Sequence, residues 1–211
     1  MDEFLGSIDF GTLAIVFGVL VVSITIHEAM HAFTGYWLGD DTAQREGRIS
    51  LNPIKHIDPF MTILLPLLTL LIFKAPLLVA KPVPFNPNRV KFEDFGAALV
   101  GLAGPLTNLV LAAAGAGVLR LFGTDLGDLG VQIVGIFTVI NVGLFVFNML
   151  PIPPLDGSRV LYAFAPDPLR RVMEALEQWG IVVIFSLVLL VPGFTDLLSN
   201  LNSAVINWLL Q

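Results

Sequence analysis

A continuous apolar stretch, residues 10–38, contains the sequence His27-Glu28-Ala29-Met30-His31, with two of the three histidines of the chain. Residues four apart lie on one face of a helix, so both imidazoles can reach one metal ion. Glu28 follows the first histidine, where it can face a metal-bound water as in the HExxH zinc site. Ionisable groups at membrane depth are costly and usually functional, so the pattern predicts a hydrolytic zinc centre within the membrane. The alternative is a pair of structural histidines bonded to carbonyl groups of a helix bundle.

The composition places this motif in an integral membrane protein. Of 211 residues, 55% are hydrophobic and 13% charged, and the mean hydropathy is +0.84. Soluble domains carry about 25% charged residues. The length predicts a single domain over residues 1–211. The absence of cysteine excludes Cys-ligated zinc and iron–sulfur sites, and a net charge of −6 without a basic run argues against nucleic acid as a partner.

Five apolar stretches predict the membrane segments of an all-α polytopic protein. They cover, approximately, residues 10–38, 60–80, 95–122, 131–150 and 179–191. The last is long enough to cross only with its flanking residues to Leu198, because a spanning helix needs about twenty residues. The tail, residues 200–211, predicts a short interfacial helix with Trp208 near the headgroups. We expect about four spanning helices, with the stretch over residues 60–80 as the uncertain one.

Charge and proline content indicate that the second stretch does not cross. Pro66, Lys74 and Pro76 interrupt it, and proline breaks helices. If all five stretches cross, the two sides of the membrane carry seven and four Lys and Arg residues. If residues 60–80 re-enter and return, the numbers are ten and one. The positive-inside rule therefore predicts a re-entrant segment, and it places the carboxyl end of the first stretch on the cytoplasmic side.

A catalytic zinc ion usually has three protein ligands, so a third ligand is expected. The remaining histidine, His56, lies in a turn-rich loop, where a loop histidine, a residue at the mouth of the site and a polar partner are all open interpretations. Asp156 is the stronger candidate. It follows the proline-rich residues 151–154 and precedes Gly157, and unwound backbone at membrane depth occurs only where it lines a cavity or is buried in protein. Its alternative role is an ordinary turn.

A shared ion also predicts helix directions. His27 and His31 lie toward the carboxyl end of the first stretch, and Asp156 follows the carboxyl end of the fourth. They can share an ion only if these two stretches run in the same direction, which requires one crossing between them. The third stretch must be that crossing, in agreement with the re-entrant assignment, and the active site then lies toward the cytoplasmic side.

Three motifs together resemble the site-2 protease family of intramembrane zinc metalloproteases. They are His27-Glu28-x-x-His31, Gly104-Pro105-x-x-Asn108 and Pro154-Leu155-Asp156-Gly157. The resemblance covers most of the chain and is closest to short prokaryotic-type members without PDZ or CBS domains. In one departure, the family's Asn-Pro pair before the Asp-Gly motif is spread out here as Asn148 and Pro151.

The resemblance implies roles for individual residues. His27, His31 and Asp156 would bind Zn²⁺, Glu28 would be the general base, and the substrate would be a transmembrane or membrane-proximal protein segment in the lipid bilayer. Asn108 is a candidate amide donor to the developing oxyanion. An interhelical hydrogen bond is an equally good interpretation of Asn108, and the same ambiguity holds for Asn141 and Asn148.

Two other functions are compatible with intramembrane histidines and a carboxylate. A zinc transporter or metal-binding channel would need such groups, but transporters usually carry polar residues along a path and show inverted repeats. A catalytically silent relative would not need an intact HExxH. The convergence of the polar groups on one point favours the metalloprotease, and the oligomeric state stays open.

Overall fold

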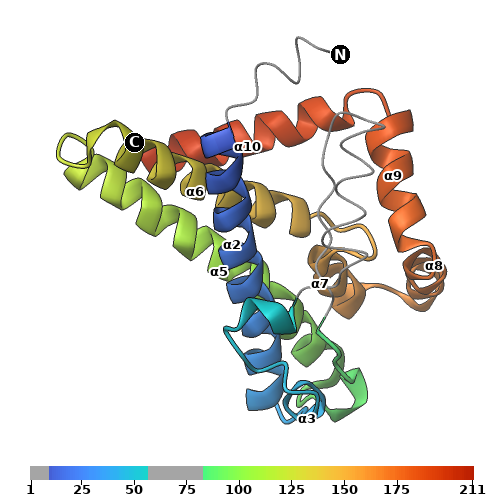
Figure 1. Cartoon of the computed structure of the whole chain (residues 1–211). Helices are drawn as coiled ribbons and strands as arrows, with labels where there is room; N and C mark the ends of the chain where they lie inside the picture. Colours follow the sequence, from blue (N-terminus) through green and yellow to red (C-terminus); the bar gives the residue numbers. More distant parts are fainter. Residues whose placement is uncertain (1–9, 57–82) are drawn as a thin grey trace.

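The computed structural model describes residues 10–56 and 83–211, which form α-helices and short 3-10 helices with no strand among them (Figure 1). In chain order these are α2 (Phe10–Trp37), α3 (Thr42–Arg45), η1 (Pro53–Lys55), η3 (Pro87–Arg89), α5 (Glu93–Phe122), α6 (Gly127–Asn148), α7 (Asp156–Phe164), α8 (Asp167–Glu177), α9 (Gly180–Leu190) and α10 (Phe194–Leu210). The predicted all-helical polytopic membrane fold is confirmed. The re-entrant segment predicted around residues 60–80 lies outside the described residues.

Three helices are long and apolar enough to cross a membrane. α2, α5 and α6 have 28, 30 and 22 residues, with mean hydropathies of 2.2, 1.8 and 2.2. At 1.5 Å per residue the shortest is about 33 Å long, and a bilayer core is about 30 Å thick. Their bounds agree with the first, third and fourth predicted stretches to within a few residues.

The fifth predicted stretch, residues 179–191, is helical, but the helix does not continue through the flanking residues to Leu198. α9 has 11 residues and ends at Leu190, and α10 begins at Phe194. Pro192 cannot donate a helical hydrogen bond, and Gly193 takes a φ of +80° that favours glycine. α9 is only about 16 Å long. α8 and α9 are bent by 91° to each other and pass the length and hydropathy test only together, so the described residues contain three spans, or four if this pair is one span.

The carboxyl-terminal helix is longer than predicted and joins the helical core. α10 starts at Phe194 rather than near residue 200 and has 17 residues. It packs against a buried cluster that α5 and α6 form with Ala112, Val142 and Val146. The α10 residues in this contact are Leu198, Val205, Ile206 and Leu209. Trp208 is 66% exposed, and its position near the headgroups stays a prediction.

Two interhelical hydrogen bonds establish the relative direction of α2 and α6. Gln132 Nε2 donates to Thr12 Oγ1 over 2.8 Å, and Asn141 Nδ2 donates to Ser23 Oγ over 2.9 Å. The residue with the higher number on α2 contacts the residue with the higher number on α6. α2 and α6 therefore run parallel, as the shared-ion argument predicts for the first and fourth stretches.

α5 runs antiparallel to α2. His31 Nδ1 lies 2.7 Å from Val100 O, whereas His27 Nδ1 lies 2.5 Å from Asn108 Oδ1, so the contact points advance in opposite directions. Near the carboxyl end of α2, the Lys91 N–H donates to Leu38 O over 2.8 Å. The end of α2 and the start of α5 thus lie together, on the same side as the end of α6.

A buried carboxylate ties the loop after α2 to the residues that precede α5. Asp40 is 2% exposed and accepts hydrogen bonds from Thr42 N over 3.0 Å, from Thr42 Oγ1 over 2.5 Å and from Asn86 N over 2.6 Å. Burial alone would raise the pKa of Asp40, but the hydrogen bonds from Thr42 and Asn86, together with the charge of Arg89, hold it below its usual value. The ionised carboxylate therefore stabilises this junction.

The substitution Asp40→Asn should destabilise the protein in a pH-dependent way. Hydrogen bonds to a charged group contribute about 1.5–3 kcal/mol. Because the folded-state pKa lies below the unfolded-state value, this contribution is complete above the unfolded pKa and is lost as the pH falls through the folded one. Thermal unfolding in detergent should show a gap between wild type and variant that is largest near neutral pH and closes below about pH 4.

Asp41→Asn is the matched control. Asp41 is a neighbouring, more exposed carboxylate that pairs with Arg45 and Arg89, and exposed pairs contribute at most about 1 kcal/mol. An Asp40→Asn variant no less stable than Asp41→Asn at neutral pH would contradict the assignment.

Candidate metal centre

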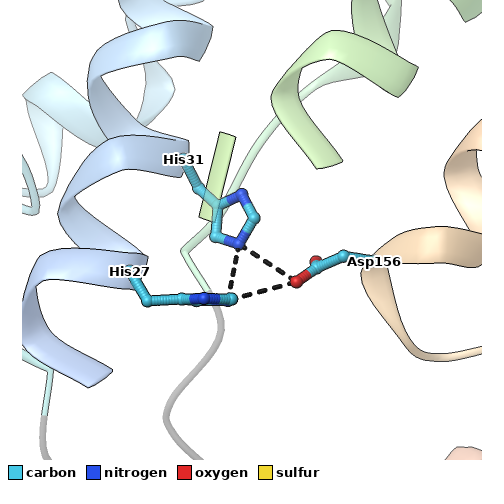
Figure 2. Close-up of side chains that lie close together, drawn as sticks. All are labelled: His27, His31 and Asp156. Carbon is cyan, nitrogen blue, oxygen red and sulfur yellow. Dashed lines mark hydrogen bonds and ion pairs between the residues drawn. The ribbon is translucent and has the colours of Figure 1, made fainter. Parts of the chain in front are cut away.

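Three side chains predicted as metal ligands converge on one point. His27 and His31 come from α2, and Asp156 is the first residue of α7 (Figure 2). The two Nε2 atoms are 3.0 Å apart, and Asp156 Oδ2 lies 3.1 Å from the Nε2 of His27 and 3.3 Å from that of His31. Both histidines are buried, at 5% and 8% exposure. The sequence-derived set is therefore brought together as a group that can hold a metal ion.

The break between α6 and α7 places the Asp156 side chain next to the two histidines. α6 ends at Asn148, and the prolines within residues 151–154 prevent its continuation. α7 packs against α5, and its first turn lies close to the backbone that follows α6. A Cβ on Gly157 would lie 2.7 Å from Leu150 O and closer still to Met149 O, so only glycine fits at this approach. This close contact fixes the direction in which the preceding Asp156 side chain leaves the helix.

Gly104 of α5 leaves space for the two histidine side chains. A Cβ on Gly104 of α5 would lie 2.6 Å from His27 Nε2 and closer still to His31 Nε2. α5 therefore approaches α2 with bare backbone at the point where the ligand atoms meet. A side chain at position 104 would occupy the space that an ion between the two Nε2 atoms needs.

The side chains of His27, His31 and Asp156 present only hydrogen-bond acceptors to one another, so a positive charge is needed between them. Val100 O can only accept, so His31 Nδ1 carries its hydrogen, and the Nε2 of the neutral ring has a bare lone pair. The Asp156 carboxylate oxygen faces the same point. An ionised carboxylate and imidazole lone pairs all accept. A proton or a metal cation has to lie between them.

The separations fit zinc. Zinc binds nitrogen and carboxylate oxygen at about 2.0–2.1 Å in tetrahedral geometry, so neighbouring ligand atoms are about 3.3 Å apart. The observed separations of 3.0, 3.1 and 3.3 Å are close to this value. Two imidazoles and a carboxylate are also a donor set that catalytic zinc sites use.

Glu28 lies beside this group without being part of it. It is 8% exposed, and its Oε2 accepts a hydrogen bond from the Val83 N–H over 3.1 Å. Val83 is the first described residue before α5 and lies in a stretch without regular secondary structure that precedes η3. The bond holds the carboxylate at a defined position next to the histidines.

Asn108 contacts a predicted ligand directly. Its Oδ1 lies 2.5 Å from His27 Nδ1, and its Nδ2 donates to Asn141 Oδ1 over 2.8 Å. The side chain is fully buried. Of the two interpretations left open by the sequence, the observed contacts are those of an interhelical hydrogen bond, and the role as an oxyanion donor stays a prediction.

Two further candidates make contacts elsewhere. Asn148 Nδ2 donates to Leu144 O of its own helix over 3.0 Å. His56 is buried, and its Nε2 lies 2.6 Å from Ser50 O in its own loop. His56 is therefore placed as a loop histidine outside the three-residue group.

The role of two residues was not predicted: Ser23 was not identified from the sequence, and Gly104 was named only as part of the Gly104-Pro105-x-x-Asn108 motif. Ser23 accepts a hydrogen bond from Asn141 beneath the metal centre, and Gly104 borders it. A signal existed in each case, because both residues precede a site residue by four positions and so share its helix face. The hydrogen bond from Val83 to Glu28 joins residues far apart in sequence, and no local pattern indicates it.

Comparison with known proteins identifies the family. The family model described as "Peptidase family M50" matches residues 116–191. A protein of Bacillus subtilis, named "Putative zinc metalloprotease YwhC", is 39% identical over 195 residues, which cover 87% of this chain and 84% of the relative. The chain belongs to peptidase family M50, the site-2 protease family. The resemblance seen in the sequence is thereby confirmed.

Other relatives agree with this assignment. "Putative zinc metalloprotease Rip2" of Mycolicibacterium smegmatis is 28% identical over 184 residues, covering 85% of this chain and 68% of the relative. No solved structure is significantly similar to the chain. As a member of family M50 the protein is a metalloprotease, a hydrolase acting on proteins in a membrane context, as the sequence predicted over a transporter.

The substitution Gly104→Ala should empty the metal centre. The added methyl group would collide with both Nε2 atoms, so the variant should lose most of its bound metal in elemental analysis of detergent-purified protein. Gly117→Ala is the matched control on the same helix, because a Cβ there meets none of the described residues within 4 Å. Equal metal content in the two variants would contradict the proposed location of the ion.

Proposed function

We propose that this protein is an intramembrane zinc metalloprotease that hydrolyses peptide bonds in transmembrane or membrane-proximal segments of its substrates. The observation that carries the proposal is the convergence of three acceptor atoms, from His27, His31 and Asp156, beside apolar helices long enough to span a membrane. Membership of family M50 and the names of the relatives support it.

The proposed zinc ligands are His27, His31 and Asp156. Zinc held by them would act as a Lewis acid and lower the pKa of a coordinated water to about 7. The protein supplies the surroundings: neutral imidazoles with their Nδ1 hydrogens committed to Val100 O and Asn108 Oδ1, and a carboxylate fixed at the start of α7. Such outer hydrogen bonds orient the rings and raise their basicity.

Glu28 is the proposed general base. Its carboxylate would take a proton from the attacking water and pass it to the leaving amine. The Val83 N–H bond keeps one carboxylate oxygen in place during this transfer. Asn108 remains a candidate donor to the oxyanion, provided that its amide also reaches the substrate.

The substrate segment would have to be extended at the cleaved bond. In a helix, each carbonyl is engaged by the N–H four residues on, which shields the peptide bond from attack. A transmembrane helix would therefore have to unwind locally before it is cut.

The distribution of positive charge supports a site toward the cytoplasm. Nine Lys and Arg residues lie in the described ranges, and of these only Arg120, in the last turn of α5, lies toward the opposite end of the bundle. The other eight lie in segments that follow α2, precede α5 or follow α6. Ion pairs link these segments, such as Arg89 with Asp41 and Arg170 with Asp94. The positive-inside rule assigns this end to the cytoplasm.

Bound metal is the first test of the proposal. Wild-type protein purified in detergent should contain about one zinc per chain, and Asp156→Ala should lose most of it because one of three ligands is gone. Asp125→Ala, in the loop at the other end of α5, is the control and should keep its zinc. Full zinc occupancy in Asp156→Ala would remove Asp156 from the ligand set and contradict the proposed site.

The substitution Glu28→Gln tests the chemistry separately from metal binding. The amide cannot take up a proton, and loss of general base catalysis typically lowers the rate about 10²- to 10⁴-fold. We expect zinc content to stay at the wild-type level. Cleavage is measured on single-span model proteins reconstituted with the enzyme in vesicles, with products identified by mass spectrometry. Wild-type cleavage rates in Glu28→Gln would refute its role.

A further inference from the structure

A chain of buried hydrogen bonds runs from α6 through α5 to His27. Asn141 Nδ2 donates to Phe137 O and to Ser23 Oγ, each over 2.9 Å. Asn141 Oδ1 accepts from Asn108 Nδ2 over 2.8 Å, and Asn108 Oδ1 lies 2.5 Å from His27 Nδ1. Ser23, Asn108 and Asn141 are all 0% exposed. Amides buried this deeply are costly unless every polar atom is paired, so their presence needs a reason.

The donor and acceptor at each step of this series of hydrogen bonds follow from the bond between Asn141 and Phe137 O, at the end farthest from His27. A backbone carbonyl only accepts, so the amide nitrogen of Asn141 must face Phe137 O, and Asn141 Oδ1 must face Asn108. Asn108 then has to turn its own nitrogen toward Asn141, which leaves Asn108 Oδ1 for His27. A carbonyl oxygen cannot donate. His27 Nδ1 therefore carries the hydrogen, and Nε2 keeps the lone pair that points at His31 and Asp156.

His31 has the same tautomer, with its hydrogen on Nδ1, and a single hydrogen bond is enough to set it. Its Nδ1 faces Val100 O directly, with no amide between them. Each of the two rings thus has its tautomer set by a backbone carbonyl, one directly and one through two amides. Ser23 does not influence the choice, because a hydroxyl can both donate and accept.

From this geometry we propose that Asn141 is a positioning residue for the metal centre: it fixes the orientation of Asn108 and thereby the metal-binding tautomer of His27. It does so without touching His27. The proposal rests on the proposed function, because it takes His27 as a ligand. Without Asn141, the Asn108 amide is free to turn its nitrogen toward His27 Nδ1. His27 would then carry its hydrogen on Nε2, and that hydrogen would block metal binding by the ring atom that faces His31 and Asp156.

The first measurement is the protonation of the histidine rings by ¹⁵N NMR of the full chain, before and after zinc is removed. The chain has only three histidines, so the ring signals can be assigned by substitution. His27 and His31 should carry a hydrogen on Nδ1. His56 provides an internal contrast, because its Nε2, not its Nδ1, faces the carbonyl of Ser50. A wild-type His27 without a hydrogen on Nδ1 would overturn the proposal, independently of the results for the variants.

The second measurement is zinc affinity, by competition with a chelator. Asn141→Leu keeps a similar side-chain volume and should bind zinc about 10- to 100-fold more weakly, with a new population of His27 protonated on Nε2. Thr138→Val is the matched control. It removes another buried polar group of α6, bonded to Val134 O, and should leave the affinity unchanged.

The double variant Asn108→Asp/Asn141→Leu distinguishes orientation from packing. A carboxylate accepts through both oxygens, so aspartate at position 108 cannot present a donor to His27, and Asn141 is no longer needed. The double variant should regain most of the zinc affinity and the Nδ1-protonated His27. If it binds zinc as weakly as Asn141→Leu, or if Asn141→Leu binds as tightly as wild type, the proposal is wrong. A wild-type protein without zinc would instead refute the proposed function.

Discussion

Three hydrogen-bond acceptors lie within 3.3 Å of one another in a buried site: the Nε2 atoms of His27 and His31 and a carboxylate oxygen of Asp156. Atoms this close leave no room for a water between them, and without a positive charge between them their repulsion would drive them apart. A metal cation bound there would remove that repulsion, with the same atoms as its ligands. Much of the surrounding structure serves to keep these atoms together: the fold brings α2 and α7 to one point, and hydrogen bonds to carbonyl groups keep the Nε2 lone pairs free.

The close approach of these helices depends on one face of α5. Positions three or four apart on this helix carry small residues or an amide, so that α2, α7 and α6 can each pack against its backbone. These residues are Gly101, Gly104, Asn108, Ala112 and Gly115. A Cβ at position 101 would lie 3.0 Å from Asp156 O, and one at position 115 would lie 3.2 Å from a ring carbon of Phe137. Because membrane helices gain little from hydrophobic burial against each other, such contacts are a main source of their association.

The extent to which the sequence predicted this structure follows from the range of each interaction. The HExxH helix and the three spans could be predicted, because helical periodicity and hydropathy can be read from the sequence. The parallel direction of α2 and α6 could be predicted because the spacing of the candidate ligands indicated that they share one ion. The fifth stretch was predicted to cross with its flanking residues to Leu198, which was wrong because the helix ends at Leu190 before the turn at Pro192 and Gly193. Hydropathy alone does not show this turn. The packing of α10 and the bond between Val83 and Glu28 depend on partners distant in the chain, which no local pattern identifies.

The difference between the two histidines shows why a metal site among membrane helices needs more than its ligands. His31 meets a backbone carbonyl, whose oxygen accepts in every orientation. His27 meets a side-chain amide instead, and an amide can turn either its oxygen or its nitrogen toward the ring. In water, the wrong orientation would cost little, because solvent pairs the displaced groups. In a site closed to solvent it would leave a donor facing a donor, at a cost comparable to a lost buried hydrogen bond. A second amide anchored on Phe137 O removes this ambiguity, which gives a physical reason for placing Asn108 and Asn141 together in the apolar interior.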